Sequence, residues 1–561
     1  MNPSDPSART RRRRLLGHFA LCIYAAWLVA GVFPISPAEG DEQGVINGAT
    51  AMARGEKAYL RLAYSPEIQP GAYVLLSTAS RWSGLPVQDL FAAGTVAGAA
   101  LFALLAAWLL ARVLAIPISV ALTALLLCQE ISASAYYMNT TALGMWLVFA
   151  ALCLACRTPD RHTCAAMVVA IAVAGWIRID CLLATPALPV LLYLAGRDLR
   201  TTLKVGGVIA CGSLALVALL YRASGVTPAS IMSIYSGRGA VEGWWPTVRA
   251  LPLLLSPLIC VLLAAGSILL IVRREWRLLI LIAAGVGATL PVYGTSLAST
   301  KYFYHLVPFF LLAALYAGKV VWRRVTAAPV WTDRKLRVAF ASAVGLLALA
   351  DQAAGLLTSA PEFRRYTPSP ALASLATLPG PRRPARLVIG PGEIIPTTDG
   401  FRLRTGALFA PWIWRREKTA MLAQLRQFTS LLCASPRTTV YFSGWLPYQM
   451  VIRMLRAEGF AFKTGKLAPT TMPYVGDWND GRHCVHIDYL AYRTSPFFHP
   501  DYRPENLTGE HTYFVGDLSG LQPITELADQ RDWVPLWPEH LYRFVTFFGR
   551  AGPVPASVPS G

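Results

Sequence analysis

The chain has 561 residues, of which 55% are hydrophobic and only 15% are charged. Soluble domains carry about 25% charged residues, so this composition excludes an ordinary soluble protein and predicts a polytopic membrane protein. Its 51 Lys and Arg residues exceed its 31 Asp and Glu residues, which gives a formal net charge of +20. We do not expect nucleic-acid binding, because the arginines lie between hydrophobic blocks, where positive charge fixes membrane orientation.

The N-terminal segment, residues 1–14, is basic and contains Arg9 and the run Arg11 to Arg14. An apolar stretch from Leu15 to Phe33 follows, and it is long enough to span a bilayer. We interpret it as an uncleaved first helix that starts in the cytoplasm, because its apolar run exceeds the roughly 7–15 residues of a signal peptide. A cleaved signal is the alternative, since Ser36 to Ala38 have small residues at a suitable spacing.

Ten further apolar stretches bring the expected number of membrane helices to about eleven. They cover residues 90–110, 116–136, 140–156, 164–177, 181–195, 205–221, 250–272, 278–296, 302–321 and 338–357. When successive helices alternate direction, every short basic loop falls on the cytoplasmic side. The parts that then lie outside are the loop 34–89, the helix end at Arg178, the loop 222–249, the turn 299–301 and everything after about residue 358.

This topology depends on the short pair of helices at 164–195 and on the last helix, which carries Asp351. Removing one helix would exchange the two sides for every segment that follows it. The expected location is the inner membrane of a cell, with a cytoplasmic N-terminus and an extracytoplasmic C-terminal part.

From about residue 380 the composition becomes mixed polar, and strand-like runs alternate with helical patterns, which indicates a small α/β domain. Strands are expected at 386–389, 438–442, 460–462 and 484–489, and helices at 417–433 and 446–458. The chain thus divides into two domains. Residues 15–357 form a membrane domain, which includes the loop 34–89. Residues 358–561 form an extracytoplasmic α/β domain with an irregular tail. Cys433 and Cys484 of this domain could form one disulfide.

The outer loop 34–89 is long for a connection, and loops longer than about 12–15 residues are usually functional or disordered. Asp41 and Glu42 open a stretch with good helix content. Both acids would lie in the first helical turn, where the helix dipole favours negative charge, so capping alone would also explain them. After Pro70, a second amphipathic stretch from Ala72 to Trp82 is suited to lying at the membrane interface.

This layout resembles the GT-C superfamily of glycosyltransferases that use polyprenyl-phosphate sugars. The shared features are one helix, an outer loop that opens with Asp-Glu and continues through two interfacial helices, about ten more helices, and an outer C-terminal domain. The superfamily includes the protein O-mannosyltransferases, the aminoarabinose transferases that modify lipid A, and rhizobial-type galacturonosyl or mannosyl transferases. The resemblance covers residues 15 to about 320, and its specific motifs are short.

The resemblance implies a role for each motif. The family's first-loop carboxylate, which acts on the acceptor, corresponds to Asp41, with Glu42 beside it. The family's Pro-Pro element corresponds to residues 67–73, where only Pro70 is kept and the basic residue that some members carry is missing. Residues 178–180, Arg-Ile-Asp, resemble the Arg-x-Asp element that ends a mid-chain helix.

A late element, residues 301–308, resembles the family's Arg/Lys-Tyr motif, whose cation meets the lipid phosphate. Sugar transfer from a polyprenyl phosphate needs a base near the acceptor hydroxyl and cations at the leaving phosphate. We expect Asp41 to be the base and Glu42 to orient the acceptor or to hold a divalent metal, which some branches of the family use. The other expected site residues are Lys301, Arg178, His305 and Arg81 for the phosphate, and Gln69, Tyr73, Asp180 and Tyr302 for the substrate.

Simpler explanations exist for several of these residues. Lys301 and Arg178 could reach lipid headgroups from the interface, and Arg178 with Asp180 could form a structural ion pair. Glu130, an acid inside an apolar segment, could be functional or could have a hydrogen-bonded structural role.

Alternate residues from Cys484 to Asp488 share a strand face and include His486, but their spacing matches no strong zinc pattern. We expect an ordinary strand there.

Two other functions are compatible with this sequence. A flippase for lipid-linked glycans would have ionisable residues at mid-membrane and broken, symmetric helices, whereas the charge here concentrates on one outer face. A non-catalytic GT-C-like scaffold would explain the incomplete Pro-Pro element. We expect the transferase, which moves a hexose or pentose from its polyprenyl phosphate to an extracytoplasmic hydroxyl of an envelope glycan, lipid or protein by an inverting displacement.

Overall fold

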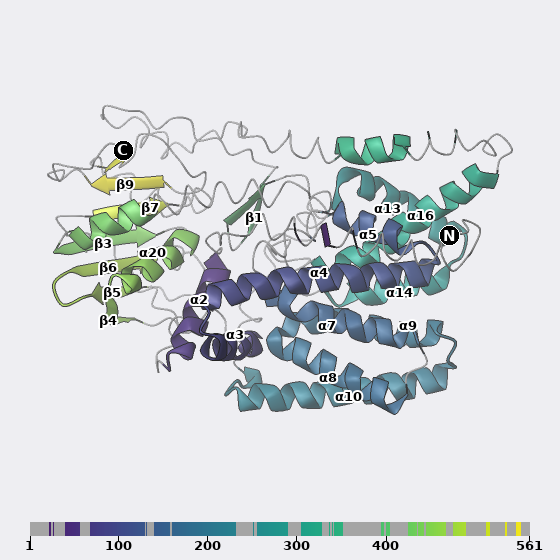
Figure 1. Cartoon of the computed structure of the whole chain (residues 1–561), viewed down its shortest axis with the longest axis horizontal. Helices are drawn as coiled ribbons and strands as arrows, with labels where there is room; N and C mark the ends of the chain where they lie inside the picture. The colour runs from purple at the N-terminus through teal and green to yellow at the C-terminus, as the bar shows by residue number, and fades with distance from the viewer. Residues whose placement is uncertain are drawn as a thin grey trace. The chain divides into compact units, whose positions relative to one another are not determined.

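The protein is described by a computed structural model (Figure 1). Apart from a few single positions, the described residues are 40–55, 68–128, 140–157, 160–229, 255–289, 304–327, 342–351, 394–397, 400–403, 425–434, 436–442, 445–466, 475–489, 512–516, 533–535 and 546–550. Of the expected features, Glu130, Lys301, Tyr302, most of the loop 222–249 and most of the segment 15–33 lie outside these residues.

The chain divides into two compact units. The first consists of Met1–Ile35, Ser65–Ala360 and Arg404–Ile413. The second consists of Ser36–Tyr64, Pro361–Leu403 and Trp414–Gly561. The first part of the expected outer loop therefore belongs to the second unit, together with the C-terminal part of the chain.

The first unit is a bundle of mostly apolar helices. The helices are α3 (Pro70–Ser83), α4 (Val87–Leu114), α5 (Ile118–Leu126), α7 (Thr140–Ala155), α8 (Arg161–Ile177), η3 (Ile179–Ala184), α9 (Ala187–Leu194), α10 (Leu199–Ala223), α13 (Pro257–Val272), α14 (Trp276–Gly287), η5 (Tyr304–Leu306) and α16 (Val307–Ala327). Helices α4, α7, α8 and α10 lie side by side in that order, and α13 packs against α16 (Figure 1).

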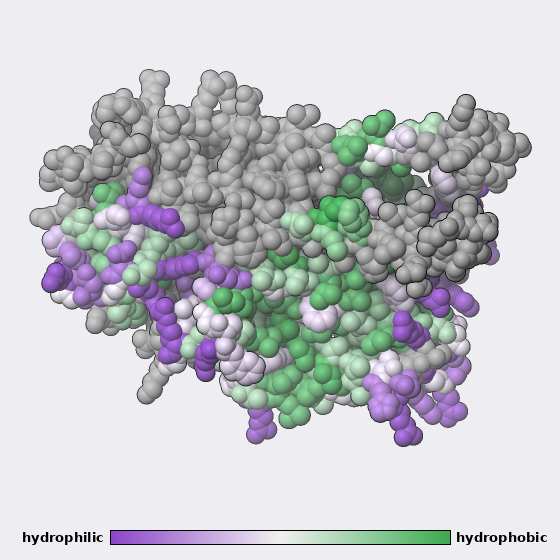
Figure 2. All heavy atoms as spheres, in the orientation of Figure 1, coloured by the Kyte–Doolittle hydropathy of each residue, from purple (hydrophilic) through white to green (hydrophobic). Residues whose placement is uncertain are grey.

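Much of the apolar surface of this bundle faces outward. Within the described residues, three helices are long and apolar enough to cross a membrane, Val87–Leu114, Leu199–Ala223 and Tyr304–Val325, and six apolar helices are shorter. Leu203 and Val208 of α10 are 62% and 66% exposed, and hydrophobic side chains cover much of the visible face of the bundle (Figure 2). Because so large an apolar surface would be unfavourable in water, the chain is a membrane protein. The count of about eleven helices stays a prediction.

Small residues allow the helices to approach closely, as is common between membrane helices. At Gly266 of α13, an added Cβ would lie only 1.9 Å from the carbonyl oxygen of Ala313 in α16. Since that neighbour is backbone, it cannot move aside as a flexible side chain would. Gly266 therefore sets the contact between α13 and α16.

Acidic residues cap several helices of the bundle. The carboxylates of Asp160 and Asp198 accept hydrogen bonds from the backbone N–H of Thr163 and Thr201 at the starts of α8 and α10. These bonds lower the pKa of both carboxyls, because they stabilise the charged form. Asp351, in the last apolar stretch, accepts a bond from the backbone N–H of Leu258 near the start of α13. Asp351 thus has a capping role.

The second unit contains a seven-stranded mixed sheet in the order β4-β5-β6-β3-β7-β9-β8 and a separate hairpin of β1 and β2. Strand β3 is parallel to both β6 and β7, and the other neighbours are antiparallel. The strands are β1 (Ile394–Thr397), β2 (Gly400–Leu403), β3 (Arg437–Phe442), β4 (Ala461–Lys466), β5 (Val475–Asn479), β6 (Cys484–Tyr489), β7 (Thr512–Gly516), β8 (Trp533–Pro535) and β9 (Thr546–Arg550).

The strands expected at 438–442 and 484–489 coincide with β3 and β6, and the one expected at 460–462 overlaps the start of β4. The helix expected at 446–458 coincides with α20 (Trp445–Ala457). The fourth expected strand, 386–389, lies outside the described residues. Residues 425–434 are helical and overlap the helix expected at 417–433. Cys433 and Cys484 are both free thiols, so the disulfide considered from sequence is not formed in this structure.

Helix α2 (Gly40–Ala53) packs against α20 within the second unit. Val45, Ile46 and Ala49 are at most 3% exposed, so one face of α2 is fully buried. The helix expected after Asp41 is therefore confirmed, and it belongs to the core of the unit that carries the sheet.

The turn between β5 and β6 allows a test of the expected topology. Asp480 accepts bonds from the backbone N–H groups of Arg482 and His483, both at 2.7 Å, whereas the Arg482 side chain is exposed. We expect an Arg482→Cys variant to react with a membrane-impermeant maleimide from outside intact cells. Background should be low, because partial burial raises the pKa of the Cys433 thiol to about 11 and also raises that of Cys484, and the thiolate is the reactive form.

The matched control is Lys204→Cys, at an exposed position near the start of α10 on the expected cytoplasmic side. It should react only after the membrane is permeabilised. Protection of residue 482 in intact cells, with labelling after permeabilisation, would contradict the expected topology.

Candidate functional site

The candidate site in the first unit is built around the segment 68–73, which leads into α3. Pro70 occupies the first turn of this helix, and Gln69 precedes it as the N-cap residue. Proline is well suited to this position, because the N–H groups of the first helical turn have no acceptor within the helix. The N–H that proline lacks is therefore not needed there. The helix expected at 72–82 is therefore confirmed, and its place at the membrane interface stays a prediction. Tyr73 points into the bundle and is buried, whereas Trp82 is 87% exposed.

Arg178 is the centre of a buried polar cluster. Its backbone is extended between α8 and η3, and its side chain is only 4% exposed. The guanidinium Nε donates to Asp180 at 2.8 Å, and Nη1 donates to the hydroxyl of Thr140 at 2.7 Å and to the amide oxygen of Gln69 at 3.3 Å. The Thr140 hydroxyl donates in turn to Gln69 at 2.7 Å. One cation thus joins the starts of α3 and α7 to the end of α8.

A second set of contacts fixes the same segment from α8 and α10. The Tyr221 hydroxyl lies 3.2 Å from the carbonyl oxygen of Ile68 and 3.1 Å from that of Gly175. A Cβ at Gly71 would lie 2.6 Å from the Trp176 ring and 2.7 Å from the Trp176 carbonyl oxygen, so only glycine fits there. Helices α8 and α10 therefore hold the backbone of residues 68–71 in one conformation.

The late Tyr-His element is also buried. The Nε2 atom of His305 lies 2.7 Å from the hydroxyl of Thr289, just beyond α14. The ring of Tyr304 packs against Phe102, with centroids 4.4 Å apart, and Phe102 packs on Phe149. The side chain of His305 is 1% exposed, so it anchors η5 to α14.

The other expected site residues are placed as follows. Arg81 is exposed in the last turn of α3. Asp41 and Glu42 lie in the first turn of α2 in the second unit, and their side chains are outside the described residues. The structure thus brings Gln69, Arg178 and Asp180 together, and the roles of all these residues stay predictions.

The geometry of Arg178 bears on two of the roles that the sequence left open for it, a cation at the donor phosphate and a structural ion pair with Asp180. Its charge is matched by a carboxylate 2.8 Å away, and both side chains of the pair are 5% exposed. The guanidinium is buried and its charge is already paired. It is therefore better placed to hold the segment 68–73 than to neutralise a phosphate. The arrangement therefore favours the structural ion pair.

Two residues of this site were missed from sequence, Thr140 and Tyr221. Each is a polar group at the end of an apolar run, Thr140 as the first residue of α7 and Tyr221 near the end of α10. Buried hydroxyls need hydrogen-bond partners, so a hydroxyl at the end of an apolar run was the signal in the sequence that could have pointed to these two residues. Their partners lie 38 to 153 residues away in the chain, a distance that no local pattern spans.

Within the described parts of the chain, no three His, Cys, Asp or Glu side chains are grouped as metal ligands. On the strand face considered from sequence, His486 lies 2.7 Å from the carboxylate of Asp477 on β5. This pair joins directly opposed residues of β5 and β6, as expected for cross-strand neighbours.

No family model and no curated protein matches the chain. Two solved structures of ArnT from Cupriavidus metallidurans are similar to it. The apo state matches with a TM-score of 0.52 and 14% identity over 94% of this chain and 97% of that one. The state bound to undecaprenyl phosphate matches with a TM-score of 0.49 and 14% identity over 95% and 98% of the two chains. The likeness to the apo state shows that this chain shares the fold of ArnT.

Proposed function

We propose that the protein is a membrane glycosyltransferase that moves a sugar from a polyprenyl phosphate to a hydroxyl group outside the cytoplasm. The observation that carries this proposal is the fold shared with ArnT along 94% of the chain. A crystal structure of ArnT contains bound undecaprenyl phosphate, which supports a lipid phosphate of this class as the donor carrier. The acceptor belongs to the envelope glycans, lipids or proteins.

In the proposed reaction, the carboxylate of Asp41 takes the proton of the acceptor hydroxyl. The acceptor oxygen then bonds to the anomeric carbon of the sugar, while the bond from that carbon to the phosphate oxygen breaks. The phosphate leaves with the bonding electron pair and is stabilised by cations, for which we propose Lys301 and Arg81. A single displacement of this kind inverts the anomeric configuration.

Arg178 has a different role in this proposal. With Asp180, Thr140 and Gln69 it fixes the segment 68–73 and the start of α3, and α3 carries Arg81 in its last turn. Arg178 is thus a positioning residue for the first-loop cation. Preorganisation of this kind lowers the cost of binding a charged group, because the loop is ordered before the ligand arrives.

The proposed arrangement in the membrane follows from the basic loops. We propose about eleven membrane helices, a cytoplasmic N-terminus, and an extracytoplasmic α/β domain that contains the seven-stranded sheet. The protein would lie in the inner membrane, where donor lipids are presented on the outer leaflet.

The test is an assay on the purified full-length protein in proteoliposomes. The vesicles would contain radiolabelled sugars on undecaprenyl phosphate, supplied one at a time, with an extract of envelope glycolipids as acceptors. We expect acceptor-dependent release of undecaprenyl phosphate and transfer of the label to the acceptor. Movement of intact donor across the membrane, without cleavage of the sugar-phosphate bond, would instead identify a flippase and contradict the proposal.

A further inference from the structure

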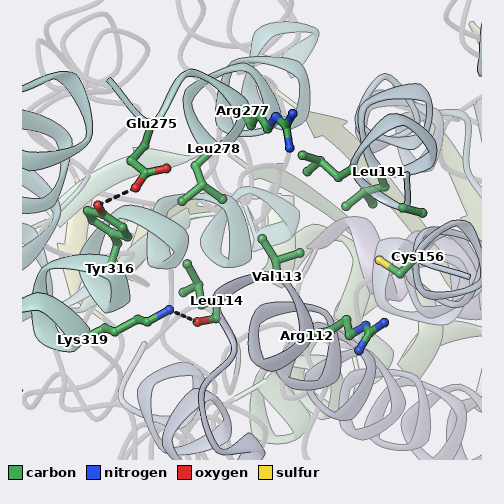
Figure 3. A pocket seen from close by; sticks show the side chains of 12 residues that line it. Arg112, Val113, Leu114, Cys156, Leu191, Glu275, Arg277, Leu278, Tyr316 and Lys319 are labelled. Atoms are coloured by element: carbon green, nitrogen blue, oxygen red, sulfur yellow. Dashed lines mark hydrogen bonds between the residues drawn. The ribbon is translucent and has the colours of Figure 1, made fainter. Parts of the chain in front are cut away.

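A cavity of about 450 Å³ lies at the end of the helical bundle away from Arg178. It is formed by the last residues of α4 and α9, the residue after α7, the start of α14 and the middle of α16 (Figure 3). Thr140 of the Arg178 cluster begins α7, and Cys156 of the cavity follows its end. At 1.5 Å per residue these two positions are roughly 24 Å apart along the helix, so the cavity lies near the opposite face of a bilayer.

A second cavity of about 310 Å³ adjoins the first and shares Glu275, Tyr316 and Lys319 with it. The lining of the two cavities contains one carboxylate, that of Glu275, and six cations. The cations are Arg112, Arg273, Arg277, Lys319, Arg323 and Arg324. The Glu275 carboxylate also accepts a hydrogen bond from the Tyr316 hydroxyl at 3.0 Å. The two cavities therefore carry a strong excess of positive charge.

Lys319 has donor capacity for a ligand. The Lys319 ammonium donates to the carbonyl oxygen of Leu114 at the end of α4, which uses one of its three donors. Arg112 and Arg277 extend from two different helices at the rim of the same cavity (Figure 3). Orientation by basic loops explains positive charge at a helix end. It does not explain why these cations surround a hollow.

The surroundings indicate a lipid rather than a soluble anion. Part of the lining is apolar, from Val113, Leu191 and Leu278. Trp276, next to Arg277, is 56% exposed, and Trp322, next to Arg323, is 45% exposed. Exposed tryptophans are typical of the interface between the headgroups and the hydrocarbon core. The cavity therefore opens at the depth where lipid phosphates lie, beside apolar surface that can contact acyl chains.

We infer that this cavity binds the phosphate headgroup of an anionic membrane phospholipid from the leaflet at the basic end of the bundle. Basic pockets between membrane helices bind such headgroups in other proteins. The volume falls within the range of about 300–1,000 Å³ found for small-molecule sites. The site is separate from the proposed sugar transfer and does not depend on it.

The test compares the full-length protein in nanodiscs of phosphatidylcholine alone and in nanodiscs that also contain phosphatidylglycerol. Thermal unfolding and native mass spectrometry would report stabilisation and retained lipid. We expect phosphatidylglycerol to raise the melting temperature of the wild type and to stay bound after detergent transfer. Arg112→Gln should weaken retention about tenfold or more, since hydrogen bonds to charged groups are among the stronger ones. Addition of Arg277→Gln should weaken it further.

Lys204→Gln is the matched control, because this exposed lysine lies outside the residues that line either cavity. It should retain the lipid as the wild type does. Arg112→Lys keeps the charge and should recover part of the binding, which separates loss of a contact from misfolding. Unfolding in phosphatidylcholine alone checks that each variant is folded. Equal retention in Arg112→Gln and wild type, or equal stabilisation by inorganic phosphate alone, would overturn the inference.

Discussion

Replacing Asp41 by asparagine is expected to lower the rate of sugar transfer by a factor of about 10²–10⁴, the usual contribution of a general base. The substitution is close in shape and removes the negative charge. Asparagine caps helices about as well as aspartate, so α2 should form normally even if Asp41 also has a capping role. The measurement is the initial rate of transfer in proteoliposomes, with the amount of folded protein in the membrane determined in parallel.

Two neighbouring acids serve as controls for this variant. Glu39 precedes α2, and Glu39→Gln should leave the rate unchanged. Glu42→Gln tests the expected supporting role and should have a smaller effect than Asp41→Asn. Full activity of Asp41→Asn at normal abundance would exclude Asp41 as the base, and strong loss only in Glu42→Gln would move that role to the adjacent residue.

Replacing Arg178 by glutamine is expected to lower the free energy of unfolding by about 3–5 kcal/mol, the usual cost of removing one partner from a buried ion pair. Asp180 would be left as a buried carboxylate without its cation, and Thr140 and Gln69 would lose their shared donor. The measurement is chemical or thermal unfolding of the purified protein in one detergent. A double variant, Arg178→Gln with Asp180→Asn, should recover a large part of the loss, because no unpaired charge would remain.

The same experiment distinguishes the two roles that were considered for Arg178. A structural role predicts loss of stability and recovery in the double variant. A direct contact with the donor phosphate predicts normal stability, weaker donor binding and no recovery. Normal stability of Arg178→Gln would therefore contradict the positioning role proposed above.

The sequence predicted the apolar helices well, because a lipid-facing helix needs a continuous apolar run, and composition records this directly. It was less successful where a run contains a break in the backbone. The stretch 181–195 was expected to be one helix, but the structure has η3 up to Ala184 and then α9 from Ala187. Pro186 lies between them and has no backbone N–H to donate. A hydropathy pattern does not show that a backbone hydrogen bond is missing at this proline.

The buried contacts of the site were harder to predict. The Arg178-x-Asp180 pair is local in sequence and was recognised as a possible ion pair. The link from Arg178 to Gln69, 109 residues earlier in the chain, depends on how α3, α7 and α8 pack. Similarly, nothing near Asp41 indicates that α2 packs on α20, because both helices are short and about 390 residues of chain separate them.

The packing of α2 against α20 also has a consequence for biosynthesis. Residues 40–53 leave the ribosome early, while their partner helix, residues 445–457, is made about 390 residues later. At about 5–20 residues per second, the apolar face of α2 waits for roughly 20–80 seconds before its partner exists. During that time the nascent helix needs a temporary partner, either the membrane surface or a chaperone. A chain shortened before residue 445 would never supply the permanent one, so truncation would remove both the sheet and the support of the helix that carries Asp41.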